Sequence, residues 1–249
     1  MPAMPAWPPK SAPRLFVTQR LHEDAGITLT GNPAHYLARV MRVAEGDTII
    51  LCDNQTGEWA ARVTSIKKRE VQAITGQNIL PREQVPDFWL CPALLKKDRF
   101  DLVLEKATEL GVAEIRPVVT RRCVADKLNP ERAASITCEA AEQCARTALP
   151  KLAGPMNLER LLNDWPGDRV LFFADEEGGA SAAQAFSATE RPAALLTGPE
   201  GGFDNAERAA IRSLPRAHPI SLGPRILRGE TAAVAATALW MALAGDWRQ

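Results

Sequence analysis

Two glycine-containing segments of the chain carry residue types from which a ligand site could be built. The first, TGPEGGF at residues 197–203, follows an apolar run ending at Leu196 and precedes the helix-like segment DNAERAAIRSL. Glycine allows positive φ angles and close approach of a ligand to the backbone, and N–H groups ahead of a helix can donate hydrogen bonds. The spacing matches neither G-x-G-x-x-G nor a P-loop, so neither a dinucleotide nor a nucleoside triphosphate is indicated. For this segment alone, an ordinary tight turn between a strand and a helix remains an alternative.

The second segment, SLGPRILRGETA at residues 221–232, follows the next strand-like run. Its glycines bracket Arg225 and Arg228, and Glu230 stands at the start of the last helical stretch, where its charge would complement the helix dipole. Alternatively, Glu230 is only a capping carboxylate and the arginines are only solvated charges. Ligands of open α/β sheets bind beyond the carboxyl ends of strands, so two such loops suggest two walls of one pocket. We therefore predict a binding site for a small, nucleoside-like molecule, with arginines nearby that could bind an anionic partner.

The elements that hold these loops predict an α/β fold. From Phe88 onward, strand-like and helix-like segments alternate, which is typical of a largely parallel sheet. The predicted strands are residues 88–94, 113–119, 169–174, 193–198 and 217–223. The predicted helices are residues 98–110 with Asp98 as N-cap, residues 130–149 behind Asn129, a helix behind Asp204 with Glu207 as its capping partner, and the alanine-rich C-terminal stretch.

The first third of the chain is dominated by short β-branched segments. Predicted strands cover residues 14–18, 48–52, 58–66 and 70–75, with a hairpin-like connection at 53–57. One helix is predicted from Pro33, with Asn32 as its N-cap. These elements indicate a small β-barrel-like domain at residues 14–82, followed by a proline-containing linker around residues 78–88 and a larger domain at 83–249.

Composition excludes several classes of protein. The 249 residues carry no net charge, and 46% hydrophobic with 24% charged residues is typical of a soluble globular chain. Five cysteines form no CxxC pair and three histidines lie far apart, so neither disulfides nor a metal site is indicated, and a cytoplasmic location is expected. Residues 1–13 lack an apolar signal core and are expected to be a disordered tail. The longest uncharged stretch, residues 231–245, is shorter than the roughly 18 apolar residues of a membrane span.

The long motifs resemble those of one family. GPEGGF together with LGPRILRGETAAVAA resembles the SPOUT methyltransferases of the RsmE type, as do KATELGV at 106–112, AAEQCAR at 140–146, and HYLARVMR followed by GD and DNQTG in the first domain. The resemblance implies methylation of N3 of one uridine in the decoding region of 16S ribosomal RNA, with S-adenosylmethionine as cofactor and the small ribosomal subunit as partner. It also implies a trefoil-knotted C-terminal domain, a PUA-like RNA-binding N-terminal domain, and a homodimer.

The resemblance also assigns residues by position. The implied cofactor pocket is lined by Thr197, Gly198, Gly201, Gly202, Leu222, Gly223, Ile226, Leu227 and Ala232. Two positions depart from the family pattern: a segment that commonly ends Thr-Glu-Arg-Ser is Thr120-Arg121-Arg122-Cys123 here, and Glu105 stands where glutamine is usual. These departures bear on substrate contacts rather than on the cofactor site.

Methyl transfer to uridine N3 first requires that the nitrogen lose its proton. We expect Arg228 to stabilise the resulting uracil anion, and Glu230 either to orient Arg228 or to accept the proton. For RNA, we expect Arg14, Arg20, His35, Arg39 and Arg42 to form one basic face on the first domain, with scattered surface charges as the alternative.

Two rival functions remain open at the level of sequence. One is a non-catalytic RNA-binding or ribosome-assembly protein that kept the fold and lost turnover. The other is a SPOUT methyltransferase acting on transfer RNA or on another ribosomal position. The intact second loop favours an enzyme, because RNA binding alone does not require both glycine-containing walls.

Overall fold

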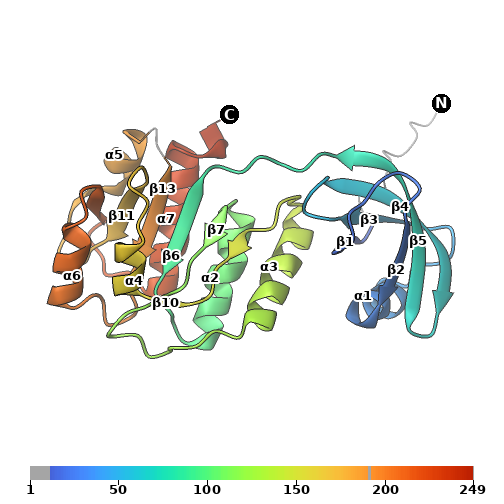
Figure 1. Cartoon of the computed structure of the whole chain (residues 1–249), viewed down its shortest axis with the longest axis horizontal. Coiled ribbons are helices and arrows are strands. Elements are labelled where there is room, and N and C mark those ends of the chain that lie inside the picture. Colours follow the sequence, from blue (N-terminus) through green and yellow to red (C-terminus); the bar gives the residue numbers. More distant parts are fainter. Residues whose placement is uncertain (1–11, 190–191, 249) are drawn as a thin grey trace. The chain divides into compact units, whose positions relative to one another are not determined.

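The computed structural model describes residues 12–189 and 192–248 (Figure 1). The chain divides into two compact units. The first holds the residues up to Gln84 together with residues 141–148, and the second holds residues 85–140 and 149–249. Of the tail predicted at residues 1–13, residues 1–11 lie outside the described residues.

The first unit is built on a five-stranded sheet with the order β1-β3-β4-β5-β2, antiparallel in every pair except β1–β3. The strands are β1 (Arg14–Phe16), β2 (Gly26–Thr30), β3 (Thr48–Cys52), β4 (Glu58–Lys67) and β5 (Glu70–Leu80). Register shifts between β4 and β5 mark irregularities of the kind that bend a sheet. A short helix, α1 (Gly31–His35), continues into a π-helical turn (Tyr36–Val40) whose Leu37 packs with Ile49, Leu51 and Val71 in the core.

Two details of this unit differ from the sequence-based expectation. β2 was not predicted, although its Ile27 and Leu29 alternate with exposed residues as a half-buried strand requires. The N-cap of α1 is Thr30 rather than Asn32, and the helix starts at Gly31, which has φ of +65°. Proline is tolerated throughout the first helical turn, so Pro33 did not fix the first residue.

The second unit holds a seven-stranded sheet with the order β12-β14-β11-β13-β6-β7-β9, in which every pair is parallel. Its strands are β6 (Phe88–Pro92), β7 (Glu114–Ile115), β9 (Lys151–Leu152), β11 (Val170–Ala174), β12 (Ala180–Ser181), β13 (Ala193–Thr197) and β14 (Ala217–Ser221). A separate pair joins β8 (Val118–Val119) to β10 (Met156–Asn157). The helices are α2 (Lys97–Glu109), α3 (Pro130–Cys144), α4 (Leu158–Asn163), α5 (Ala182–Ser187), α6 (Asn205–Arg212) and α7 (Gly229–Leu243), and a 3-10 turn (Asp246–Arg248) follows.

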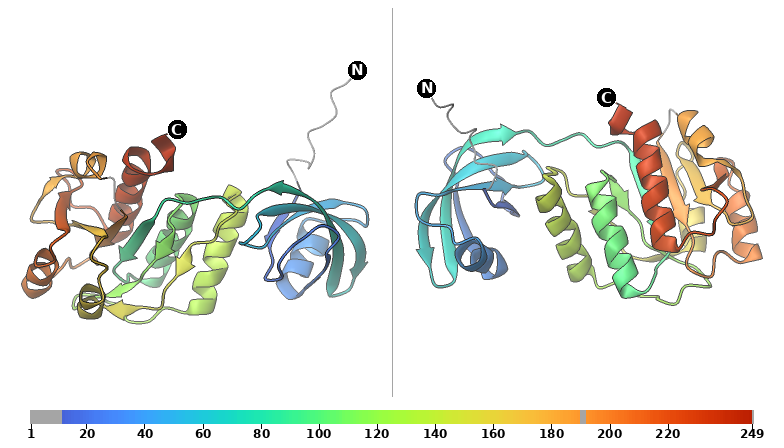
Figure 2. Two further views of the ribbon diagram at one scale, coloured as in Figure 1. Left: turned by 45° about the horizontal axis from the view of Figure 1, so that its top comes forward. Right: turned by 180° about the vertical axis from the view of Figure 1, so that it is seen from behind.

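Helices cover this sheet on both faces. Leu195 of β13 faces a core with α2, α5 and α7, whereas its neighbour Leu196 faces a second core with α4 and α6. Figure 2 shows α2 and α7 side by side, and Trp240 of α7 stacks on Phe88 of β6 with ring centroids 4.1 Å apart. Burial on both faces explains why the central strands read as continuous apolar runs.

The observed helix boundaries show which of the predicted capping residues are correct. The capping box of Asp204 and Glu207 is confirmed, and the side chain of Asn129 accepts a hydrogen bond from the Arg132 backbone, as an N-cap does. The N-cap of α2 is Lys96, with Asp98 in the first turn, so the predicted cap was wrong.

Two further boundaries differ. α3 ends at Cys144 instead of Leu149, because Ala145 adopts φ of +61° and breaks the helix before Pro150 is reached. The strand predicted at 113–119 is divided into β7 and β8, and Pro117, which has no N–H to donate, lies between them. In the described part of the chain, none of the helices combines the length and apolar character needed to cross a membrane.

Candidate functional site

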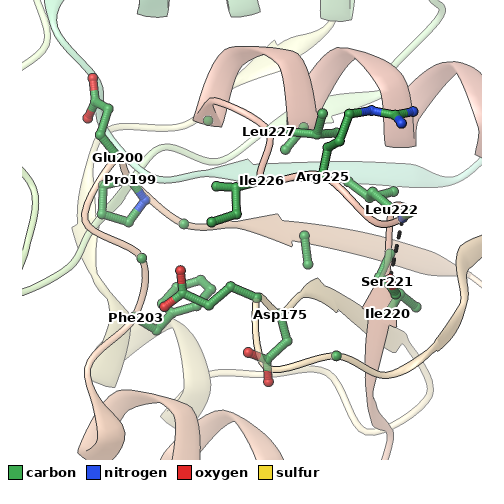
Figure 3. A pocket seen from close by; sticks show the side chains of 18 of the residues that line it. Asp175, Pro199, Glu200, Phe203, Ile220, Ser221, Leu222, Arg225, Ile226 and Leu227 are labelled. Carbon is green, nitrogen blue, oxygen red and sulfur yellow. Dashed lines mark hydrogen bonds between the residues drawn. The ribbon is translucent and has the colours of Figure 1, made fainter.

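The two glycine-containing loops meet at the carboxyl edge of the parallel sheet. β14, β11 and β13 are adjacent, and the loops that follow them enclose a cavity of about 200 Å³ (Figure 3). The segment predicted at 197–203 supplies one wall and the segment predicted at 221–232 supplies another. The prediction that the two loops share one pocket is therefore met by the geometry.

Seven of the nine residues expected to hold a cofactor line this cavity: Gly198, Gly202, Leu222, Gly223, Ile226, Leu227 and Ala232. The other two do not line it. Thr197 is buried at the end of β13, where its carbonyl accepts a hydrogen bond from the Ala93 N–H at 2.8 Å. The carbonyl of Gly201 accepts a hydrogen bond from Nη1 of Arg122 at 2.8 Å. These two residues shape the first loop from behind.

Two glycines of the walls have positive φ angles. Gly202 has φ of +65°, and a Cβ atom there would lie 2.7 Å from Oε1 of Glu176. Gly223 has φ of +109°, and a Cβ atom there would meet no other atom within 4 Å, so its requirement is conformational only. The absence of a side chain at Gly202 thus leaves room for the Glu176 carboxylate beside the cavity.

A third wall was not predicted. It is formed by Ala174, the last residue of β11, and by Asp175, Glu176 and Gly178 of the loop that follows. The sequence holds a signal for it, since DEEGG follows the apolar run RVLFFA as the two predicted loops follow theirs. Its acidic residues resemble ordinary solvated charges, which is why the pattern was not read as part of a site.

Asp175 anchors this third wall. Its side chain is fully buried and accepts hydrogen bonds from Nε of Arg208 at 2.9 Å and from Nη2 of Arg212 at 2.7 Å. Burial by itself would raise the pKa of Asp175, but the hydrogen bonds from Arg212, from the Glu177 backbone and from Arg208 outweigh burial and lower it. Asp175 is thus held as a carboxylate that fixes two arginines of α6 against the loop.

The lining combines charge with apolar surface. Glu176 is half-exposed at the cavity, while Phe203, Leu222 and Ile226 offer apolar side chains, and 91% of Ile226 is exposed. Arg208 and Arg225 also line the cavity, so it offers both carboxylates and guanidinium groups, and the apolar side chains can cover a flat ring. The arrangement suits a small molecule that carries charged groups together with an aromatic ring.

The predicted catalytic pair lies apart from the lining. Arg228 is exposed and serves as the N-cap residue of α7, and among the described residues it forms no ion pair with Glu230. Glu230 is buried and lies 3.8 Å from Nε of Arg99, and its Oε2 has no hydrogen-bond partner. The expectation that Glu230 orients Arg228 or accepts the proton therefore stays a prediction. The closer partner, Arg99, lies on α2 and could not be chosen from spacing.

The segment that departs from the family pattern packs against the first loop. The backbone N–H of Arg121 donates to Glu207 at 2.7 Å, and its Nη1 donates to Asp204 at 2.9 Å. Asp204 and Glu207 form the capping box that starts α6 directly after the loop, and Arg122 bonds to Gly201. The two arginines thus brace the first wall from outside.

The five residues expected to contact RNA differ in their local surroundings. Arg14 is half-buried and paired with Glu58 at the start of β4, and Arg20 is exposed next to Leu21, whose backbone bonds to Asp53. The remaining three, His35, Arg39 and Arg42, are all exposed on the helical segment after β2. That the five residues form one basic face stays a prediction.

Among the described residues, no group of three or more histidine, cysteine, aspartate or glutamate side chains is arranged to hold a metal ion.

Comparison with known proteins gives the family. Residues 82–241 match the family model described as an RNA methyltransferase domain, and residues 29–75 match the RNA methyltransferase PUA domain. Ribosomal RNA small subunit methyltransferase E of Synechocystis is 33% identical, over 90% of this chain and 76% of that protein. The protein of the same name from Rickettsia conorii is 29% identical, over 90% of this chain and 93% of its own length.

A solved structure agrees in fold. The crystal structure of a ribosomal RNA small subunit methyltransferase E from Neisseria gonorrhoeae, bound to S-adenosyl methionine, superposes with a TM-score of 0.84 and 27% identity, covering 95% of this chain and 99% of that one. The family-model match extends over more than half of the chain and includes all three walls of the cavity. This chain therefore belongs to the RNA methyltransferase family, and within it to the relatives of ribosomal RNA small subunit methyltransferase E.

Proposed function

We propose that the protein transfers a methyl group from S-adenosylmethionine to N3 of one uridine in the decoding region of 16S ribosomal RNA. Its substrate would be the RNA within the small ribosomal subunit, and its place of action the cytoplasm. The observation that carries the proposal is the cavity beyond β11, β13 and β14, whose walls combine carboxylates, apolar side chains and glycine backbone.

The donor set of the cavity fits this cofactor. S-adenosylmethionine carries a cationic sulfonium, an ammonium group and an adenine ring, and when bound it supplies an electrophilic methyl group. Glu176 and Glu200 would offset its positive charge, and Leu222 and Ile226 would cover the adenine. The backbone groups around Gly198 and Gly202 would supply hydrogen bonds where no side chain intervenes.

The transfer itself makes a definite demand on the chain. The new bond forms between N3 and the methyl carbon as the carbon–sulfur bond breaks, and the electron pair of that bond leaves with the sulfur. N3 can attack only after its proton has gone to a base. Arg228 at the mouth of the second loop would stabilise the negative charge on the uracil oxygens, and Glu230 would accept the proton.

The decisive experiment uses the purified chain, S-adenosylmethionine and small ribosomal subunits that lack 3-methyluridine. Nucleoside mass spectrometry should find one 3-methyluridine per subunit, and primer extension should place it in the decoding region. Methylation at another nucleotide, or of transfer RNA instead, would favour the rival methyltransferase. Cofactor binding without methyl transfer to any RNA would favour a ribosome-assembly protein.

Variants of the second loop separate chemistry from cofactor binding. Arg228→Ala should reduce methyl transfer by at least about 100-fold while calorimetry finds the S-adenosylmethionine affinity almost unchanged. Arg225 is the matched control, because it lines the cavity and carries the same charge three residues earlier. Arg225→Ala should weaken cofactor binding more than it lowers the rate at saturation. Equal loss of both properties in Arg228→Ala would mean that Arg228 is structural.

We further propose that the chain acts as a homodimer and that its second unit is threaded as a trefoil knot. The support is the resemblance of the long motifs and the agreement in fold with the structure from Neisseria gonorrhoeae. Light scattering coupled to size exclusion tests the first statement, with a mass near 54 kDa expected for two chains of 27.1 kDa. Single-molecule stretching tests the second, because a knotted chain pulled from both ends stays shorter than its full contour length.

A further inference from the structure

We propose that one end of the first unit is an RNA-binding surface that combines phosphate contacts with a small apolar tip. This surface, called the hairpin-tip surface below, consists of the segment 39–42 and the β4–β5 turn at residues 67–69. The proposal rests on the proposed function, because it names the surface by which the RNA substrate would be held. The two lysines and the arginine of the turn are absent from the RNA-contacting residues expected from the sequence.

Strand pairing brings the two parts together. Thr30, the last residue of β2, pairs with Glu70, the first residue of β5, so α1 starts beside the hairpin turn. The loop after the π-helical turn comes back to the same strand end, where the Ile66 N–H donates to Glu45 at 3.2 Å and the Gly46 N–H donates to the Val63 carbonyl at 2.8 Å. Both ends of the helical segment are therefore fixed at the end of β4 that carries the turn.

This arrangement separates the surface from Arg14. Arg14 pairs with Glu58 at the first residue of β4, whereas Lys67 is the last residue of that ten-residue strand. At about 3.3 Å per residue the two ends are separated by up to roughly 30 Å along the strand, which the register shifts bend. One stretch of RNA backbone held at the hairpin tip would therefore not need Arg14.

The surface has an excess of positive charge. Its five cations are exposed: Arg39, Arg42, Lys67, Lys68 and Arg69. The three carboxylates nearby are each bound within the protein: Glu45 by the Ile66 N–H, Asp47 by the Ala44 N–H, and Glu70 by Lys67 and Gln72. Of the five cations, only Lys67 has an ion-pair partner among the described residues, at 3.4 Å. The other four cations are available to an anionic polymer.

An apolar tip lies between two of these cations. Val40 is 61% exposed and Met41 is 38% exposed, and they are flanked in sequence by Arg39 and Arg42. Arg42 has φ of +54°, a conformation that side chains other than glycine rarely adopt, and the preceding turn is π-helical. Both features are frequent at functional sites.

Charge and size together point to nucleic acid. Arginines that flank an apolar pair can bind phosphates while Val40 and Met41 contact the face of an unstacked base. Two apolar side chains are too few for an ordinary protein interface, which buries about 800 Å² on each partner. The experiment must therefore exclude two other binding partners for this surface, a protein and an anionic membrane.

The test measures RNA binding by the full chain as a function of salt, with 16S ribosomal RNA and transfer RNA as probes. Lys68→Ala/Arg69→Ala should weaken binding and lower the slope of log K against log salt by about 1.5, since each phosphate contact contributes roughly 0.7–0.9. Met41→Ala should weaken binding about fivefold without changing the slope, because it removes apolar contact but no charge. Arg62→Ala is the control, since Arg62 is exposed between Ala61 and Val63, which face the core beneath α1.

Each result of these binding measurements either supports the proposed RNA-binding surface or overturns it. The proposal is overturned if Lys68→Ala/Arg69→Ala binds both RNAs like the wild type, or if Arg62→Ala weakens binding equally. It is also overturned if Lys68→Ala/Arg69→Ala binds naked RNA like the wild type but no longer binds small subunits or phosphatidylserine vesicles. The surface would then bind a protein or a membrane instead of RNA. If wild-type protein binds RNA through this surface but transfers no methyl group to 16S ribosomal RNA, the surface stands and the proposed function falls. Circular dichroism and urea unfolding confirm that each variant keeps a folded first unit, which carries all of the substituted residues.

Discussion

Nη1 of Arg99 donates a hydrogen bond of 2.9 Å to the carboxylate of Glu200, and thereby joins the first turn of α2 to the first wall of the cavity. The same guanidinium lies 3.8 Å from Glu230 at the start of α7. Arg99 thus lies close to one carboxylate in each of the two glycine-containing segments. Its side chain is about one-third exposed, so the ion pair with Glu200 contributes modestly to stability and more to the placement of the loop.

A double-mutant cycle should detect this coupling. Arg99→Ala and Glu200→Ala are each expected to weaken S-adenosylmethionine binding severalfold, and the double variant should lose less than the sum, with a coupling free energy of about 0.5–1 kcal/mol. Calorimetry of the four proteins measures it. Strictly additive losses would mean that the contact does not hold the loop.

Gly202→Ala should damage the cavity through the backbone. The substitution places a Cβ at φ of +65°, which costs about 1 kcal/mol, and directs it 2.7 Å from the Glu176 carboxylate. We expect a lower free energy of unfolding in urea and a cofactor affinity reduced by tenfold or more. Gly154→Ala is the matched control, because no atom lies within 4 Å of a Cβ there and its φ is unexceptional. Similar effects in both variants would contradict the role assigned to Gly202.

Asp175 should make the free energy of unfolding of the second unit depend on pH in acidic solution. Its pKa is lowered in the folded state from an ordinary value of 3.8, so its stabilising effect is complete above that value and is lost as the pH falls through the folded pKa. Asp175→Asn should be less stable than wild type by about 1.5–3 kcal/mol at pH 7, because Arg208 and Arg212 lose their charged hydrogen bonds to the buried carboxylate, although Arg208 keeps its ion pairs with Glu176 and Glu177. Urea unfolding between pH 2 and pH 7 measures the difference, which should shrink below about pH 4. A difference that stays constant with pH would exclude the carboxylate charge as its cause.

Glu230→Gln tests the proposed proton acceptor. The substitution keeps the shape and removes the charge, so the rate at saturating substrates should fall about 100-fold or more while cofactor affinity changes little. Single-turnover kinetics and calorimetry measure the two quantities. If cofactor affinity and melting temperature fall together while the rate at saturation persists, Glu230 serves only to hold Arg99.

Local signals predicted the two loops because their requirements are local. Positive φ at Gly202 and Gly223 and a capping box at Asp204 can be read within a few residues, and so could most strands of the second unit. The third wall could not be read in this way. Asp175 becomes part of a site only because Arg208 and Arg212, more than thirty residues later, are folded onto it.

The sequence likewise could not predict which charged residues pair with one another. Spacing brings Glu230 close to Arg228 along the chain, but the start of a helix points consecutive side chains in different directions, and Arg99 arrives from another helix. The basic face on the first domain stays a prediction. Its members were grouped by sequence proximity, whereas the pairing of β2 with β5 selects the turn at 67–69 as the neighbour of Arg39 and Arg42.

The position of β6 inside the parallel sheet, between β13 and β7, has a consequence for synthesis of the chain on the ribosome. β6 begins at Phe88, but its neighbour β13 begins only at Ala193. At roughly 5–20 residues per second, about 5–20 s pass before β13 emerges. During that interval one side of the β6 backbone has no native partner, and the apolar side chains of Leu90 and Cys91 lack part of their eventual cover. The nascent protein should therefore depend on chaperones in proportion to the length of this delay, and slower translation of residues 93–192 should lower the yield of folded enzyme.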